Sequence, residues 1–480
     1  MATPHDGEAA TAPLPETTAW SVDGWEFTCR GPLHRGLRLG SYLEVEDAAG
    51  GARVGGIRAL RLHEDASGRQ LEVRGRLLDG GDDPAPFDDA RVRVASTEAL
   101  HRLTDDPKAG LVVGSLRTDP QVPARLRAGG LNRHTFLCGQ SGSGKTYSLG
   151  VLLEQILLGT RLPVLVIDPN GDHVHLGQTR EETDADLARR YLDASRGTRV
   201  LAAQPGEDFT PLRVRFSEAG LDGIAALLGL DPIADREEYN ALVHFFRQAP
   251  AEGLDSIDAA SDLMATSSEQ LIEALHMRIE NLGIDAMTVW SYRTTPTALD
   301  HWERPETRAV VADTSGFETR RERLLLTVAV LQGLWQRRLQ RRPLLLVVDE
   351  AHDVCPAEPG DPLERLATDL FTRIAGEGRK YGIHLLLATQ RPDKLPENVL
   401  SQCDNLLLMR VNSAGDRHAL AERFGFAPPA LVDLAGSFGL GEALLVGQIA
   451  PVPMLVRMGG RISPEGGADL GNTWALPPEH

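Results

Sequence analysis

Between residues 20 and 118, apolar and polar residues alternate in short segments, of which Leu71 to Leu77 is a clear example. Turns rich in Gly and Asp separate these segments. Strict alternation is typical of strands that bury one face, and closely spaced strands of this kind favour a small barrel or sandwich. The pattern therefore predicts an N-terminal β-barrel over 20–118. The preceding residues, 1–19, are rich in Ala, Pro, Thr and acidic residues and are predicted to be a disordered tail.

After Arg133 the apolar residues form continuous runs, at 135–138, 163–168, 308–313, 344–349, 383–389 and 406–409. A strand has this pattern when helices cover both of its faces, as in a parallel sheet. Helical patterns separate the runs, which predicts a doubly wound α/β core with a mostly parallel sheet. The core is expected in two parts, 119–215 and 303–462, because residues 216–302 are mostly helical in pattern and form an insertion. A C-terminal tail is expected over 463–480.

Length and composition fit a globular protein of two or three domains, with 480 residues of which 42% are hydrophobic. A net charge of −18 argues against a protein that coats nucleic acid with its whole surface, but it does not exclude DNA held in a narrow basic channel. No apolar run approaches the roughly 20 residues that span a bilayer, no signal peptide is recognisable, and the four cysteines lack metal-ligand spacing. We therefore expect a cytoplasmic protein without a membrane segment.

The strongest motif follows the strand at 135–138 and fits G-x-x-x-x-G-K-[ST]. In such a loop, backbone N–H groups converge on phosphate oxygens at a helix N-terminus. Lys145 is predicted to reach the β- and γ-phosphates and Thr146 to bind Mg²⁺. Only four of the 50 basic residues are lysines, so a lysine in this position is unlikely by chance. The predicted ATP-binding residues are Gly139, Gln140, Ser141, Gly142, Ser143, Gly144, Lys145, Thr146 and Tyr147.

Two further strand ends carry candidate chemistry. Asp349 ends a buried apolar strand, where an NTPase places the carboxylate that holds Mg²⁺. Glu350 follows and is predicted to polarise the attacking water as a general base, which favours hydrolysis over nucleotide binding alone. Gln390 ends the strand that begins at Ile383, where a neutral amide can contact the γ-phosphate and the lytic water. Taken alone, a Gln in that place is equally consistent with a simple turn.

Together these motifs resemble the HerA-like branch of the HerA/FtsK ATPases. The matching segments are 132–134, 166–172, 348–352, 377–382, 388–392 and 401–403. The resemblance implies a RecA-like P-loop core, a small barrel before it, and a homohexameric ring that moves double-stranded DNA through its centre. It also implies arginines that reach the nucleotide of the neighbouring subunit. Arg133 matches one such position; Arg379 is a second candidate, with a helix-end charge as the alternative.

Three functions stay open at this point. The first is an ATP-driven DNA translocase or helicase that works with a partner nuclease. The second is a ring-shaped scaffold or sensor in an antiviral defence complex, which carries a separate effector enzyme on its N-terminal barrel. A DNA-pumping ATPase of conjugation or chromosome segregation is a third possibility, disfavoured because the chain shows neither a membrane segment nor an appended DNA-reading domain.

Overall fold

The structure is a computed structural model, and it describes residues 13–32, 34, 37–47, 51–65, 68–79, 84–204, 209–248, 269–291 and 296–467. Within this range the chain forms two compact units. Unit 1 contains the described residues up to 160, together with 388–393 and 397–460. Unit 2 contains those in 161–387, 394–396 and from 461 onward. Each unit is described by itself.

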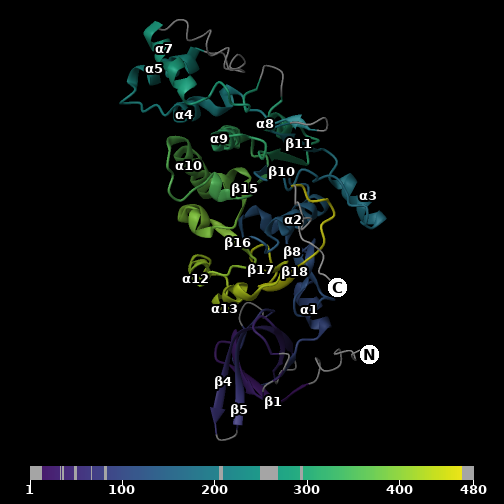
Figure 1. Ribbon diagram of the computed structural model, residues 1–480. Helices are drawn as coiled ribbons and strands as arrows, with labels where there is room; N and C mark the ends of the chain where they lie inside the picture. The colour runs from purple at the N-terminus through teal and green to yellow at the C-terminus, as the bar shows by residue number, and fades with distance from the viewer. Residues whose placement is uncertain are drawn as a thin grey trace, which may run out of the picture. The chain divides into compact units, whose positions relative to one another are not determined.

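Unit 1 begins with a closed barrel of six antiparallel strands, in the order β1-β2-β5-β4-β3-β6 (Figure 1). The strands are β1 (Pro13–Ser21), β2 (Glu26–Gly31), β3 (Tyr42–Glu46), β4 (Ala52–Asp65), β5 (Gly68–Leu77) and β6 (Phe87–Val94). Alternate residues such as Phe27, Leu43 and Ile57 are buried and fill the interior, as the period of two requires. Closure leaves no unpaired strand edge. The predicted N-terminal barrel is therefore confirmed.

The barrel starts earlier and ends earlier than its predicted boundaries. β1 begins at Pro13, so it overlaps the tail predicted over 1–19; residues 1–12 lie outside the described part of the chain. At the other end, β7 (Leu111–Leu116) pairs with β18 (Met454–Met458) instead of joining the barrel. β7 buries Leu111 and Val113 while Val112 is partly exposed. This alternation resembles that of a barrel strand, and periodicity alone does not identify the sheet to which a strand belongs.

After the barrel, unit 1 continues with a mixed sheet in the order β9-β16-β17-β18-β7-β8. The strands not yet given are β8 (Pro123–Leu126), β9 (His134–Cys138), β16 (Cys403–Leu408) and β17 (Glu442–Gly447). β9 and β16 are parallel, whereas β16, β17, β18, β7 and β8 pair antiparallel in turn. The helices of this unit are α1 (Thr97–Thr104), α2 (Lys145–Gly159), α11 (Glu397–Leu400), α12 (Ala414–Arg423) and α13 (Pro429–Asp433). Because β9 and β16 are parallel, their carboxyl ends lie side by side.

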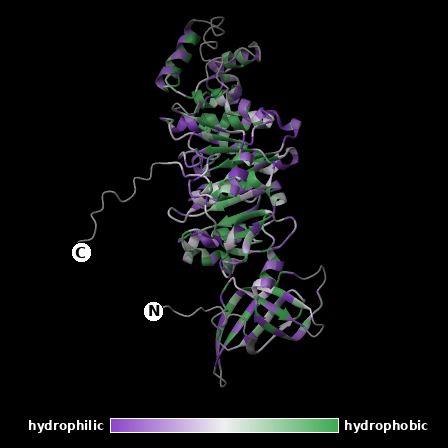
Figure 2. Cartoon of the chain, turned by 90° about the vertical axis from the view of Figure 1, so that its right-hand side faces the viewer, coloured by the Kyte–Doolittle hydropathy of each residue, from purple (hydrophilic) through white to green (hydrophobic). Residues whose placement is uncertain are grey.

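Unit 2 contains a parallel sheet in the order β12-β11-β13-β10-β14-β15. Its strands are β10 (Val164–Asp168), β11 (Thr198–Ala202), β12 (Thr210–Pro211), β13 (Ala309–Asp313), β14 (Leu344–Val348) and β15 (Ile383–Thr389). β10, β14 and β15 are buried along their whole length. Figure 2 shows the consequence: the strands of the sheet are mostly green, whereas barrel strands mix green with purple. The continuous apolar runs thus predicted the parallel sheet correctly.

The helices of unit 2 include the predicted insertion. They are α3 (Ala185–Ala194), α4 (Phe216–Leu228), α5 (Arg236–Gln248), α7 (Glu269–Asn281), α8 (Ala298–Glu303), α9 (Arg320–Gln336) and α10 (Pro362–Glu377). Residues 249–268 and 292–295 of the insertion lie outside the described residues. Among the helices that the structure describes, none combines the length and the apolar character needed to cross a membrane.

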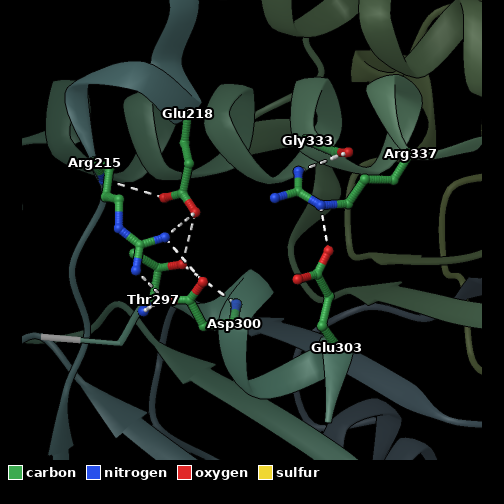
Figure 3. Close-up of polar contacts among 7 residues, drawn as sticks. All are labelled: Arg215, Glu218, Thr297, Asp300, Glu303, Gly333 and Arg337. Carbon is green, nitrogen blue, oxygen red and sulfur yellow. Dashed lines mark hydrogen bonds and ion pairs between the residues drawn. The ribbon is translucent and has the colours of Figure 1, made fainter. Parts of the chain in front are cut away.

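A polar network fixes the two ends of the insertion to each other (Figure 3). Arg215, directly before α4, donates to both carboxylate oxygens of Asp300 in α8. Glu218 in α4 accepts hydrogen bonds from the Arg215 backbone N–H and from the Thr297 hydroxyl. Bidentate Arg–carboxylate pairs of this kind add geometric specificity as well as energy. The insertion is therefore closed at its base, although its ends are far apart in sequence.

Candidate functional site

The predicted phosphate-binding loop joins β9 to α2 in unit 1. Gly142 and Gly144 have φ values of +70° and +87°, a left-handed conformation that favours glycine. Gly144 is the N-cap of α2 and no side chain caps the helix, so the first N–H groups of the helix stay available for an anion. Lys145 is only 4% exposed. The loop has the open backbone and the neighbouring cation that a polyphosphate requires.

The loop is held in place by the segment that follows β16. The Gln140 backbone N–H donates to the Arg410 carbonyl at 2.9 Å, and the Gln140 side-chain Oε1 accepts from the Asn412 N–H at 2.9 Å. Arg410 Nη2 in turn donates to the Gly142 carbonyl at 2.7 Å. These contacts fix a loop whose glycines would otherwise be conformationally free.

Sequence reasoning missed Arg410 and Asn412. The available signal was their place directly after a buried strand parallel to β9, because parallel strands bring their carboxyl ends together and ligands bind at such ends.

Gln390 lies beside the same loop. The carbonyl of Thr389, the residue before it, accepts a hydrogen bond from the Gly139 N–H at 3.3 Å. The Thr389 hydroxyl accepts from the Arg391 N–H at 3.0 Å, which turns the chain at the strand end. Gln390 itself is exposed. The backbone therefore places Gln390 next to the contact between Thr389 and Gly139, the first glycine of the motif.

The acidic motif lies in unit 2, at the carboxyl end of β14. Asp349 and Glu350 are 2% and 7% exposed, and Asp349 Oδ1 accepts from the Glu350 N–H at 2.8 Å. Glu350 has a φ of +44°, an uncommon conformation for a residue with a side chain and a frequent one at functional sites. Its Oε2 lies 3.4 Å from His352 Nδ1. The local backbone thus orients two buried carboxylates in succession.

Asp168, at the end of the neighbouring strand β10, is a third buried carboxyl. In the sequence it stands out only as part of the segment 166–172 that carries the family resemblance. It accepts hydrogen bonds from the backbone N–H groups of Gly171 at 3.0 Å and His173 at 2.8 Å. Burial raises the pKa of Asp168 to about 6, and the nearby carboxylates Asp349 and Asp313 act in the same direction. Desolvation and like charges both disfavour the ionised form, so this end of the sheet concentrates negative charge that a cation would relieve.

The two candidate arginines lie on different units. Arg133 directly precedes β9 in unit 1, is largely exposed, and has its Nη1 3.5 Å from an Asp404 carboxylate oxygen. It lines a pocket of about 430 Å³. Arg379 lies in unit 2 in the 3₁₀ turn Gly378–Tyr381, two residues beyond the end of α10 at Glu377. Burial lowers the pKa of His384, and the nearby positive charge of Arg379 acts in the same direction. Arg133 has the exposure that a contact with another molecule needs, while Arg379 also fits the helix-end alternative.

The residues present suit a magnesium nucleotide. Within the described ranges there is no cluster of three or more His, Cys, Asp or Glu that could hold a metal ion. Magnesium does not require one, because it usually keeps several waters and is bound by one or two carboxylates plus substrate phosphates. Ser143 Oγ is fully buried and lacks a hydrogen-bond partner in the described structure, as expected where a polar loop wraps an absent anion.

Comparison with known proteins identifies two families along the chain. The family described as "Helicase HerA, central domain" matches residues 111–330. The family described as "ATPase family associated with various cellular activities (AAA)" matches residues 306–411. Among solved structures, VirB4 of Thermoanaerobacter pseudethanolicus is 17% identical, has a TM-score of 0.50, and covers 73% of this chain and 96% of its own. This likeness supports the P-loop α/β fold.

Two curated relatives cover most of the chain. The DNA double-strand break repair helicase HerA of Pyrococcus furiosus is 24% identical over 416 residues, which are 77% of this chain and 74% of that protein. The probable DNA double-strand break repair helicase HerA of Methanocaldococcus jannaschii is 32% identical over 490 aligned residues, 90% of this chain and 93% of that protein. The predicted ATPase class is confirmed by these matches. The chain belongs to the HerA family of helicases.

Proposed function

We propose that this protein is a DNA motor: a ring of six copies that uses ATP to translocate or unwind double-stranded DNA, together with a separate nuclease or effector enzyme bound through the N-terminal barrel. The observation that carries the proposal is the relationship over nine-tenths of the chain to a protein described as a probable DNA double-strand break repair helicase. The braced glycine loop supports the ATP-dependent part.

The residues divide the chemistry as follows. Residues 139–147 bind ATP, with Lys145 on the β- and γ-phosphates. Thr146 and Asp349 hold Mg²⁺, which supplies charge neutralisation at the phosphates. Glu350 accepts a proton from the attacking water. Gln390 orients that water and contacts the γ-phosphate.

Arg133, and Arg379 as a second candidate, complete the site from the neighbouring copy. A cation supplied in this way stabilises the charge that develops on the transferred phosphoryl group. It also makes hydrolysis depend on assembly, because a single copy lacks the contribution of its neighbour. The exposure of Arg133 supports this role, since a side chain that reaches another subunit must be accessible in the isolated chain.

The decisive experiment measures ATP hydrolysis with and without duplex DNA, and in parallel the displacement of a strand from a forked duplex. Glu350→Gln is expected to abolish hydrolysis while it retains ATP binding, because the general base is lost but the phosphate contacts stay. Arg133→Ala is expected to lower hydrolysis by at least about a hundredfold without weakening ATP binding. Full activity of Glu350→Gln, or a protein that stays monomeric with ATP and Mg²⁺, would refute the proposal.

The same assay separates the motor from the scaffold alternative. Stimulation of hydrolysis by duplex DNA, with strand displacement, supports the motor. Hydrolysis that is insensitive to DNA but responds to a co-purified effector enzyme supports a ring-shaped scaffold or sensor. Both outcomes keep the ATP chemistry and differ only in what the ring acts on.

A further inference from the structure

The pocket beside Arg133 contains more positive charge than one arginine supplies. Its lining includes Lys108, Arg127 and Arg133, with Asp106 as the one carboxylate and with Asn132 and Gln448 as neutral polar groups. Three cations and one anion leave two net positive charges in a chain whose net charge is −18. Such a local reversal of sign attracts anions and excludes cations.

The three cations of the pocket differ in the hydrogen bonds and ion pairs that they form within the protein. Arg127 is held: its Nε donates to Asp106 Oδ2 at 2.5 Å and its Nη1 to the Ala450 carbonyl at 3.4 Å. Lys108 is exposed, and no carboxylate in the described part of the chain lies within ion-pair distance of its ammonium group. Arg133 has only the exposed contact with Asp404. Two of the three charges are therefore available to a ligand without loss of a strong internal pair.

Hydrogen bonds to one buried side chain connect the backbone segments that border the pocket. Asn405, which is fully buried in β16, donates to the Gly130 carbonyl at 3.0 Å and accepts from the Ile449 N–H at 2.9 Å. The Arg127 N–H donates to the Ile449 carbonyl at 2.7 Å. The backbone on both sides of the pocket is thus tied to one buried amide. An ordered backbone beneath long cationic side chains favours the binding of a compact anion.

We infer that this pocket receives the triphosphate end of the nucleotide bound by a neighbouring copy of the chain, and that Lys108 and Arg127 contact it together with Arg133. The inference rests on the proposed ring. Asp106 acts as a positioning residue that aims Arg127 into the pocket. A pocket of about 430 Å³ suits a compact polyphosphate, whereas a DNA backbone requires an extended basic stripe. In a closed ring each copy offers one surface to the next, so every nucleotide meets one such pocket.

The test uses rings assembled from two variants of the full chain. Glu350→Gln is defective in its own site but presents an intact pocket; Lys108→Ala has the reverse properties under this inference. Mixing them creates interfaces with an intact Glu350 on one side and an intact pocket on the other. ATP hydrolysis is expected to fall by about tenfold or more in Lys108→Ala alone, with ATP affinity unchanged, and to recover on mixing with Glu350→Gln. Mixing Lys108→Ala with Arg133→Ala is expected to give no recovery.

The possible outcomes separate this inference from the proposed function. Recovery in the Arg133→Ala and Glu350→Gln mixture is the reference: its absence refutes the ring arrangement itself. If that mixture recovers but Lys108→Ala is fully active alone, or recovers with Arg133→Ala instead of with Glu350→Gln, the inference is overturned. Lys108→Arg is expected to restore most of the activity, because it keeps the charge. Arg102→Ala is the matched control, since Arg102 lies exposed on the preceding helix and forms an ion pair with the exposed Glu98.

Discussion

Unit 1 contains two regions suited to anions, and they are built in opposite ways. The glycine loop consists of backbone groups, is tied to residues 410 and 412, and has a nearly buried lysine. The pocket beside Arg133 consists of long side chains that are partly or largely exposed above a fixed floor. Only five residues, 134–138, separate Arg133 from the first glycine of the loop. Proximity in sequence therefore does not make the two regions chemically alike.

The difference teaches which task each construction suits. Backbone N–H groups in a braced loop are already oriented, so they bind phosphate with little ordering cost. Exposed side chains in water must lose rotamer freedom, and salt screens their charge. The first construction suits tight retention of a nucleotide, and the second suits a contact that forms and breaks, as the proposed ring would require. The variants below test this contrast, beginning with the largest expected effect.

Lys145→Ala is expected to abolish tight ATP binding by the glycine loop. Removal of a nearly buried cation that is proposed to contact the phosphates costs about 3–5 kcal/mol, so ATP affinity should fall by at least about a hundredfold and hydrolysis should be lost. Titration of a fluorescent ATP analogue measures the affinity. Lys394→Ala, at an exposed lysine elsewhere in the chain, is the control and should bind normally. Unchanged affinity in Lys145→Ala would show that the loop does not hold the phosphates.

Arg410→Ala tests whether the hydrogen bonds from the segment after β16 are needed for the loop to bind ATP. The variant loses the 2.7 Å hydrogen bond to the Gly142 carbonyl, a charge-assisted contact worth about 1.5 kcal/mol. ATP affinity should therefore fall by about tenfold, measured by the same titration. Arg410→Lys should recover only part of it, because lysine lacks the planar fork. Loss of hydrolysis with unchanged affinity would instead make Arg410 a contact in the reaction step.

The glycine loop, the barrel and the parallel sheet could be predicted from the sequence, whereas the pocket could not. The G-x-x-x-x-G-K-[ST] pattern located the loop because its spacing reflects one backbone conformation. The alternating and continuous apolar runs predicted the barrel and the parallel sheet because period follows burial. Residues 349 and 350 could be proposed as site residues because they directly follow a buried strand. In each case the signal is local in the chain.

The pocket was not predictable, for the converse reason. Lys108, Arg133 and Gln448 are scattered over the chain and share no spacing. The pairing of β16 with β9 and β17 brings the surroundings of Arg133 and Gln448 together, and the contact between Arg127 and Asp106 adds the segment that carries Lys108. Arg410 escaped notice because its partner is a backbone carbonyl, which carries no residue-type signal. The barrel ends before its predicted boundary at residue 118, because β7 alternates like a barrel strand but joins another sheet.

Salt concentration should separate the two regions without any mutation. Raising ionic strength from about 0.1 M to about 1 M shortens the Debye length from roughly 10 Å to 3 Å. Exposed cations of the pocket are screened, whereas the glycine loop offers backbone N–H groups and Lys145, of which only 4% is exposed. Hydrolysis per bound ATP should therefore fall several-fold while ATP affinity changes less. Light scattering on the same samples checks that the rings stay assembled. An equal loss of affinity and turnover would contradict the contrast.

The smallest effect is expected from Asp106→Asn, which loosens Arg127 without removing a cation. Hydrogen bonds from the Lys108 N–H, followed by that from Arg127, lower the pKa of Asp106. Because the folded pKa lies below the unfolded one, the stabilisation is present above the unfolded value near 4 and is lost as pH falls through the folded pKa. The variant should be less stable at pH 7 by roughly 0.5–1 kcal/mol, seen as a lower urea midpoint, and the difference should shrink as pH falls below about 4. Hydrolysis should change less than about threefold, since a partly exposed pair orients Arg127 only weakly. A difference that stays constant from pH 7 down to about pH 3 would mean that the asparagine disturbs packing and that the ionised carboxylate is not the cause.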